Sequence, residues 1–228
     1  MIEHKIDHPR DIEYFRDFPA PLMELMQSAH FTNINSTITF FGPMLYFFAR
    51  AIGAEKVLEI GHAEGYSSHY LAHAVTDNAT RFKMEGNKYY GIDIRGNEQF
   101  ENEIKKHKLL AEIQLKDSMT LSPDSFPNEV FDIIFQDGNH DTEHVVHEFK
   151  TMWPQLKGNG NGYWIAHDVF GPAEEGWHEI KNKIIGAMPL GSVEILRIFC
   201  PYGLAIIRKM EGFDNNKRFW VEDKGMKE

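Results

Sequence analysis

Residues 57–68 read VLEIGHAEGYSS and decide the fold. The apolar run at their start predicts a buried strand from Lys56 to Ile60, because such runs suit a parallel sheet that is covered on both faces. Gly61 follows at once and permits a tight turn that a Cβ would hinder. Gly65 then opens a helix, whose free N–H groups favour an anionic or carboxylate-bearing ligand. The segment therefore predicts a strand, a turn suited to a ligand, and a helix.

The spacing of the two glycines, G-x-x-x-G, differs from the familiar phosphate-binding patterns. Neither the dinucleotide fingerprint G-x-G-x-x-G nor the Walker lysine occurs in this segment. Taken alone, the turn also fits an ordinary strand-to-helix connection that binds nothing. The function of this turn therefore depends on which side chains the neighbouring strands bring close to it.

Strands and helices alternate after this turn. The expected strands are 89–94, 112–116, 131–136, 162–166, 192–199 and 203–208, and the expected helices are 65–75, 98–110, 142–156 and 174–188, with a polar loop at 76–88. Strands joined by crossover helices form a doubly wound, mostly parallel α/β sheet with helices on both faces. Only Cys200-Pro201-Tyr202 separates the last two strands, so one of them is predicted to run antiparallel.

The expected organisation is one Rossmann-like α/β domain over residues 1–228. Helical patterns at 12–29 and 42–51 form an N-terminal helical addition within 1–52, the core occupies 53–209, and 210–228 is a polar tail. The sequence shows no internal repeat and no interdomain linker. A chain of this length buries about 70% of its unfolded surface and needs no disulfide or metal to fold.

Composition narrows the class of protein further. The 228 residues carry 24 basic and 34 acidic side chains, a formal net charge of −10. An acidic chain lacks the positive field that nucleic acids and anionic membranes attract, so neither is an expected partner. The N-terminus lacks the pattern of a signal peptide, and Cys200 as the single cysteine excludes an intramolecular disulfide. A cytoplasmic location is therefore expected.

Polar side chains follow the predicted parallel strands where each strand ends. These side chains are Asp93, Asp117, Ser118, Asp137, His140, His167 and Asp168. In open α/β sheets, ligands bind outside the carboxyl ends of the strands, so these groups and the Gly61 turn are expected to face one cleft. A carboxylate at the position of Asp93 can accept both hydroxyls of a ribose, although it could equally cap the following helix.

Together these segments resemble a known family. The pattern E-I-G-x-x-x-G-Y-S at 59–67, G-I-D at 91–93, and the D-G-x-H and H-D segments look like class I S-adenosylmethionine-dependent methyltransferases. The likeness is greatest to the branch with catechol O-methyltransferase, macrolide-sugar O-methyltransferases and cephalosporin hydroxylase-like proteins. It covers about residues 40–209 and implies a seven-stranded sheet with an antiparallel last strand.

The resemblance implies S-adenosylmethionine as the cofactor. The residues expected to contact it, from the methionine end through the ribose to the adenine, are Glu59, Gly61, His62, Gly65, Ser67, Ser68, Asp137, Asp93, Asp117 and Ser118. Acidic side chains suit the positive sulfonium and amino groups of this cofactor. His62 and Glu64 stand where many relatives have small residues, which affects the expected shape of the loop more than its role.

The resemblance also implies a metal site. In the catechol-type relatives, one acid after the fourth strand and two residues after the fifth hold a magnesium ion, and the matching positions are Asp137, His167 and Asp168. Such an ion lowers the pKa of an acceptor hydroxyl. Magnesium prefers oxygen ligands, so the nitrogen of His167 implies either another divalent metal or a structural role. His140 is a candidate general base, which makes His140, Asp137 and His167 the expected catalytic residues.

Two other functions fit parts of the sequence. The pattern H-x-x-E-H at 140–144 occurs in inverted zinc peptidases, but the turn at 137–139 places His140 before the helix, which argues against a zinc pair with His144. The second is a cofactor-binding sheet with no catalysis or a different one. For a methyltransferase, the expected acceptor is a small hydroxylated molecule. A homodimer is expected from the resemblance alone.

Overall fold

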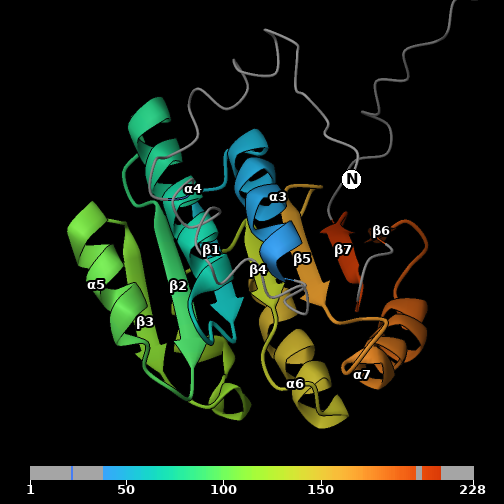
Figure 1. The fold of residues 1–228 in the computed structure, drawn as a ribbon. Helices are drawn as coiled ribbons and strands as arrows, with labels where there is room; N and C mark the ends of the chain where they lie inside the picture. The colour runs from blue at the N-terminus through green and yellow to red at the C-terminus, as the bar shows by residue number, and fades with distance from the viewer. Residues whose placement is uncertain (1–21, 23–37, 199–201, 212–228) are drawn as a thin grey trace, which may run out of the picture.

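The structure is a computed structural model that describes residues 22, 38–198 and 202–211. It contains a seven-stranded sheet in the order β3-β2-β1-β4-β5-β7-β6 (Figure 1). The strands are β1 (Lys56–Ile60), β2 (Lys88–Asp93), β3 (Ala111–Leu115), β4 (Ile133–Gln136), β5 (Gly162–His167), β6 (Val193–Ile198) and β7 (Leu204–Lys209). β1 to β5 pair in parallel, and β7 runs antiparallel to both β5 and β6. The predicted doubly wound sheet with an antiparallel last strand is confirmed.

Helices cover both faces of this sheet. α3 (Ile38–Ala51), α4 (Tyr66–Phe82) and α5 (Glu98–His107) lie on one face, and α6 (Thr142–Met152) and α7 (Glu174–Glu179) on the other (Figure 1). A hydrophobic core lies on each face of the sheet, and successive strand residues point into opposite cores. Val57 and Ile133 pack against α3 to α5, whereas Leu58 packs against α6 and α7. This alternation follows from the two-residue period of a strand. The predicted helix at 12–29 (apart from Leu22, which is buried), Cys200 and the tail beyond residue 211 lie outside the described residues.

The predicted loop at 76–88 is wrong over its first half, because α4 continues to Phe82. Polar side chains in the last turns of α4 form hydrogen bonds with neighbouring elements. The amide nitrogen of Asn78 donates to the carbonyls of Ala49 and Ala54 at 3.1 and 2.9 Å, and the hydroxyl of Tyr46 donates to Asp77 at 2.8 Å. A polar helix segment is thus stable because tertiary contacts satisfy it, which local periodicity does not reveal.

The other differences concern where elements begin and end. The helix predicted at 142–156 is α-helical only as far as Met152 and continues as a 3-10 turn at Trp153–Gln155. Pro154 lacks the N–H that an α-helix requires at this point. The helix predicted at 98–110 ends at His107, because Lys108 takes a left-handed cap with φ 52°. The helix predicted at 174–188 divides into α7, a π segment at Ile180–Ile184 and a 3-10 turn at Ile185–Ala187. Two further 3-10 turns, Ser118–Thr120 and Pro123–Ser125, follow β3.

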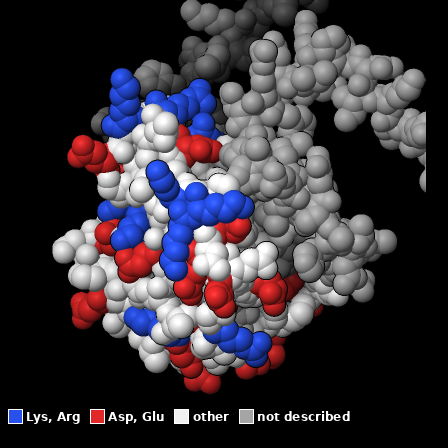
Figure 2. Space-filling view, turned by 60° about the vertical axis from the view of Figure 1, so that its left-hand side comes forward, with Lys and Arg blue, Asp and Glu red and all other residues white. Residues whose placement is uncertain are grey.

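On the face nearest α5 and β3, basic and acidic side chains are interspersed (Figure 2). Among the described residues, no helix is both long and apolar enough to span a membrane.

Candidate functional site

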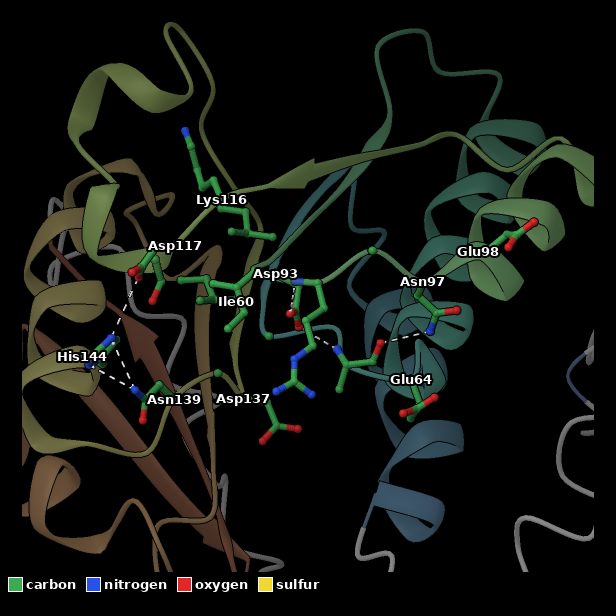
Figure 3. Close-up of a pocket in the computed structure, with 18 residues that line it drawn as sticks. Ile60, Glu64, Asp93, Asn97, Glu98, Lys116, Asp117, Asp137, Asn139 and His144 are labelled. Atoms are coloured by element: carbon green, nitrogen blue, oxygen red, sulfur yellow. Dashed lines mark hydrogen bonds and ion pairs between the residues drawn. The ribbon is translucent and has the colours of Figure 1, made fainter.

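A cleft of about 610 Å³ opens at the carboxyl ends of β1, β2 and β4. It is lined by Ile60, Gly61, Ala63, Glu64, Ile92, Asp93, Ile94, Arg95, Gly96, Asn97, Glu98, Lys116, Asp117, Ser118, Asp137, Gly138, Asn139 and His144. Figure 3 shows acidic and amide side chains of this set, among them Asp93, Asp137 and Asn139, around the open space. The cleft lies where the sequence places it, at the strand ends of an open α/β sheet.

The floor of the cleft is the turn after β1. Gly61 has φ +87°, and a Cβ at this position would lie 2.3 Å from the backbone oxygen of Asp137. The N–H of Gly61 donates to the carbonyl of Ile92 at 2.8 Å. Gly65 has φ +76°, and a Cβ there would lie 2.8 Å from Cβ of Phe100. Only glycine therefore allows the turn to approach both β4 and α5 this closely.

Asp93 connects the second strand to this turn. One carboxylate oxygen accepts the N–H of Ala63 at 2.9 Å, and the other accepts the N–H of Arg95 at 2.9 Å. The side chain of Asn97 donates to the carbonyl of Ala63 at 3.0 Å. Each carboxylate oxygen has a further lone pair, so Asp93 can hold the loop and still accept ligand hydroxyls.

The opposite wall comes from the ends of β3 and β4 and the first turn of α6. Asp117 and Ser118 line it, as does His144, whose ring nitrogen Nε2 lies 3.9 Å from Oδ1 of Asp117 (Figure 3). The amide nitrogen of Asn139 lies 3.4 Å from the same ring. Asn139 and His144 were not predicted as cleft residues; only their nearness to Asp137 in sequence could have suggested them.

Some predicted cofactor residues lie behind the turn instead of in the cleft. Glu59 is fully buried and accepts hydrogen bonds from the hydroxyls of Ser67 and Tyr89. Burial raises the pKa of the Glu59 carboxyl to about 7, although both hydroxyls oppose the shift. Ser68 and His62 are buried as well. In this structure, Glu59 therefore supports the turn from below.

Asp137, His140, His167 and Asp168 form one network beside the cleft. Nε2 of His140 lies 2.9 Å from Asp168 and 3.9 Å from Asp137, whereas Nδ1 of His167 lies 3.0 Å from Asp137 and 3.2 Å from Asp168. One donor atom each from Asp137, His140 and Asp168 falls within 4.8 Å of the other two, which is an arrangement that can hold a metal ion. The four residues that the sequence predicted to meet at the ends of β4 and β5 do meet.

The two acids control the charge of both imidazoles. Hydrogen bonds to Asp137 and Asp168 raise the pKa of His140 to about 10. Burial lowers the pKa of His167, but the same two carboxylates outweigh it and raise the value to about 9. Burial acts against ionisation of Asp168, yet the two imidazoles hold its pKa well below the usual range. Without another cation, both histidines are thus protonated at neutral pH.

His140 and His144 do not form a zinc pair in this structure. His140 precedes α6 and contacts Asp168, whereas His144 lies within α6 and contacts Asp117 on the cleft wall. The position of His140 before the helix agrees with the expectation from the turn at 137–139. The peptidase interpretation therefore has no support from the geometry of the described residues.

The sheet order, the glycine turn and the cleft are those of the Rossmann-like fold that solved methyltransferase structures share. Residues 58–169 match the model of a family described as a methyltransferase domain. This match covers 112 of the 228 residues and agrees with the resemblance to class I S-adenosylmethionine-dependent methyltransferases that the sequence shows. No curated protein is significantly similar to the chain in sequence.

Solved structures with the same fold include three methyltransferases. An O-methyltransferase from Streptomyces achromogenes involved in tomaymycin synthesis, in complex with S-adenosylmethionine, is 17% identical with a TM-score of 0.61, covering 92% of this chain and 100% of its own. An O-methyltransferase from Bacillus cereus with S-adenosylhomocysteine is 20% identical (TM-score 0.58; 86% and 96% covered). An S-adenosylhomocysteine-bound methyltransferase from Podospora anserina is 19% identical (TM-score 0.60; 89% and 94% covered). At these identities the likeness concerns the fold.

Proposed function

We propose that the protein transfers a methyl group from S-adenosylmethionine to a hydroxyl of a small acceptor, assisted by a divalent metal. The position of Asp137 carries this proposal. Its side chain lines the cleft and also belongs to the donor cluster with His140 and Asp168. A methyl group presented from the cleft would therefore face an acceptor oxygen held at the cluster.

The cleft fits this cofactor in shape and in charge. The Gly61 turn forms the floor of the cleft, and Asp93 offers carboxylate oxygens to a ribose. Asp117 and Ser118 on the opposite wall offer polar groups to an adenine edge. Asp137 supplies negative charge near the positive sulfonium. When bound, S-adenosylmethionine supplies an activated methyl group.

The donor cluster fits a divalent cation with mixed ligands. Two carboxylates and one imidazole suit Mn²⁺, Fe²⁺, Co²⁺ or Zn²⁺ better than Mg²⁺, which prefers oxygen ligands. We assign the ligand roles to Asp137, His140 and Asp168, because the His140 side chain is 38% exposed whereas that of His167 is only 2% exposed. His167, which packs against Phe41 with ring centres 5.3 Å apart, then orients both acids from below.

In this mechanism, the protein residues bind and orient the two reactants. Asp137, His140 and Asp168 would hold a divalent ion, which would lower the pKa of the acceptor hydroxyl. Asp137 and Asp168 hold the acceptor in position, whereas the Gly61 turn and Asp93 hold the cofactor. Holding the two reactants close together accounts for much of the acceleration of methyl transfer. His140 is a poor base while both acids hold its proton, since its pKa is about 10. It becomes neutral, as a ligand must be, once a cation offsets the carboxylates.

Calorimetry with S-adenosylhomocysteine tests the cofactor assignment. We expect micromolar binding by the wild type and at least ten-fold weaker binding by Asp93→Ala, because the carboxylate holds the turn and contacts the ribose. Asp124→Ala, on the 3-10 turn at Pro123–Ser125 away from the cleft, is the matched control and should bind normally. No binding to the wild type at hundreds of micromolar would overturn the assignment.

A screen of hydroxylated acceptors with Mn²⁺, Mg²⁺ or a chelator tests the reaction. We expect methyl transfer that the chelator abolishes. Cofactor binding without transfer to any acceptor would favour the alternative, a cofactor-binding domain with no catalysis or a different one.

Four expectations remain predictions from the sequence: a cytoplasmic location, a homodimer, and the lack of nucleic-acid and of membrane partners.

A further inference from the structure

Three histidines and a glutamate that lie far apart in sequence come together between α4 and α5. His69 and His73 are four residues apart on α4, and Glu103 and His107 are four residues apart on α5. The two helices lie side by side on the same face of the sheet (Figure 1). Nε2 of His107 lies 2.9 Å from Oε2 of Glu103, and the ring centres of His73 and His107 are 5.7 Å apart. Residues four apart share one helix face, so both pairs face the same seam.

We propose that His73, His107 and Glu103 form a second metal site, for a divalent transition ion such as Zn²⁺, Co²⁺ or Ni²⁺. Imidazole and carboxylate are common ligands of these ions. With metal–nitrogen distances of about 2.1 Å, two imidazoles on one tetrahedral ion have ring centres about 5 to 6 Å apart. The separation of His73 and His107 already falls in that range. A water molecule or His69 would complete the coordination.

The burial and the protonation state of the His73 side chain favour its binding of a metal ion. The side chain is 5% exposed, and its Nε2 atom is buried without a hydrogen-bond partner among the residues that the structure describes. A buried polar nitrogen without a partner destabilises the fold, and a metal ion would satisfy it. Burial also lowers the pKa of His69 and of His73 to about 4, so both imidazoles are neutral at pH 7 and their lone pairs are free for coordination.

The site has an entry path and requires one movement. The side chains of His107 and Glu103 are 23% and 27% exposed, so the seam opens to solvent beside the buried Nε2 atom of His107. Among the described residues, only the cluster with Asp137 already has three donor atoms within 4.8 Å of one another. The ring of His73 must therefore turn toward His107 as the ion binds. We expect micromolar affinity rather than the tighter binding of a preformed site.

Cobalt binding to the full chain tests the proposal. The titration uses the Asp168→Asn background, which weakens the donor cluster beside the cleft; asparagine tolerates the positive φ of 58° at this position. We expect Co²⁺ to give visible absorption bands typical of four-coordinate cobalt. His73→Leu and His107→Gln should each bind one equivalent less, or bind it at least ten-fold more weakly. The melting temperature should rise with Co²⁺ in the parent but not in these two variants.

The control is a Glu–His pair of the same spacing. Glu174 and His178 on α7 are also four residues apart, with 3.9 Å between Oε1 and Nε2. His178→Gln should bind as much Co²⁺ as the parent. His107 is partly exposed, so His107→Gln remains informative even if His73→Leu does not fold. Equal cobalt stoichiometry and affinity in His107→Gln and His178→Gln would overturn the proposal. Because the readout is metal binding alone, this result does not depend on the proposed methyl transfer.

Discussion

Nε2 of His140 lies 2.9 Å from Oδ2 of Asp168, so the segment after β4 is fastened to the segment after β5. A second contact, 3.0 Å between Nδ1 of His167 and Oδ1 of Asp137, joins the same two strand ends in the opposite direction. Each strand end thus supplies one acid and one imidazole. The two strand ends are therefore expected to act as a single unit when any one of these four groups is changed.

Asp168→Asn should separate catalysis from cofactor binding. Asparagine accepts the left-handed backbone of Asp168 but removes a charge and a metal ligand. We expect kcat/KM for methyl transfer to fall about 100-fold. Affinity for S-adenosylhomocysteine should change less than about three-fold, because Asp168 does not line the cleft. Steady-state kinetics and calorimetry measure the two effects, with Asp124→Asn as control; an unchanged kcat/KM would exclude Asp168 from the reaction.

Gly61→Ala should abolish cofactor binding, whereas Gly86→Ala should not. Both glycines have φ +87°, so the backbone strain of about 1 kcal/mol is shared. An added Cβ at Gly86 meets no atom of the described part of the chain within 4 Å, whereas at Gly61 it lies 2.3 Å from the backbone of Asp137. We expect urea denaturation to show a larger loss of stability for Gly61→Ala. Equal losses of stability in the two variants would mean that the positive φ alone, and not the contact with Asp137, requires glycine at position 61.

The buried carboxyl of Glu59 should make stability depend on pH. Burial raises its pKa from 4.5 to about 7, so the native state holds this proton more tightly than the unfolded chain. The contribution of Glu59 to the free energy of unfolding is therefore greatest below pH 4.5 and falls as pH rises to 7. Between pH 5 and pH 8 the decrease is about 2 to 3 kcal/mol. Urea denaturation at both values should show that Glu59→Gln lacks this decrease; an identical decrease in both proteins would contradict the assignment.

Asn78→Ala should destabilise the junction of α3, α4 and β1. The substitution removes the donor to the carbonyl of Ala54 and one of the two donors to the carbonyl of Ala49, which keeps the N–H of Ala54. It also leaves Arg50 without the acceptor that it contacts at 2.7 Å. We expect a loss of about 2 to 4 kcal/mol, because these groups are buried. Thr80→Ala, which removes one exposed hydrogen bond on the same helix, should stay within about 0.5 kcal/mol of the wild type. Similar losses in both variants would show that Asn78 acts only through helix propensity.

Much of the sheet could be predicted because its signals are local. Central strands such as β1 and β4 are short apolar runs, which is typical of parallel strands covered on both faces. Their order and direction then place Asp93, Asp117 and Asp137 at one edge, where the cleft is found. The tight connection before Leu204 was sufficient to predict the antiparallel strand.

The remaining features depend on contacts between distant segments. No local pattern shows that Asn78 has acceptors on α3 and before β1, so the length of α4 was underestimated. The burial of Glu59 under Ser67 likewise depends on the pairing of β1 with its neighbours. The sequence gives no sign that His73 and His107 meet, because the two positions are 34 apart. Their meeting follows only from the packing of α4 on α5.

The insertion of β7 between β5 and β6 has a consequence for synthesis on the ribosome. Among the described residues, β6 pairs only with β7, so in this part of the chain the strand has no hydrogen-bonding partner until Leu204–Lys209 has left the exit tunnel. The nascent chain can assemble β1 to β5 earlier, but it must keep that edge of β5 open. During this interval the edge is exposed to pairing with other chains, which makes the final hairpin the step most in need of protection by chaperones.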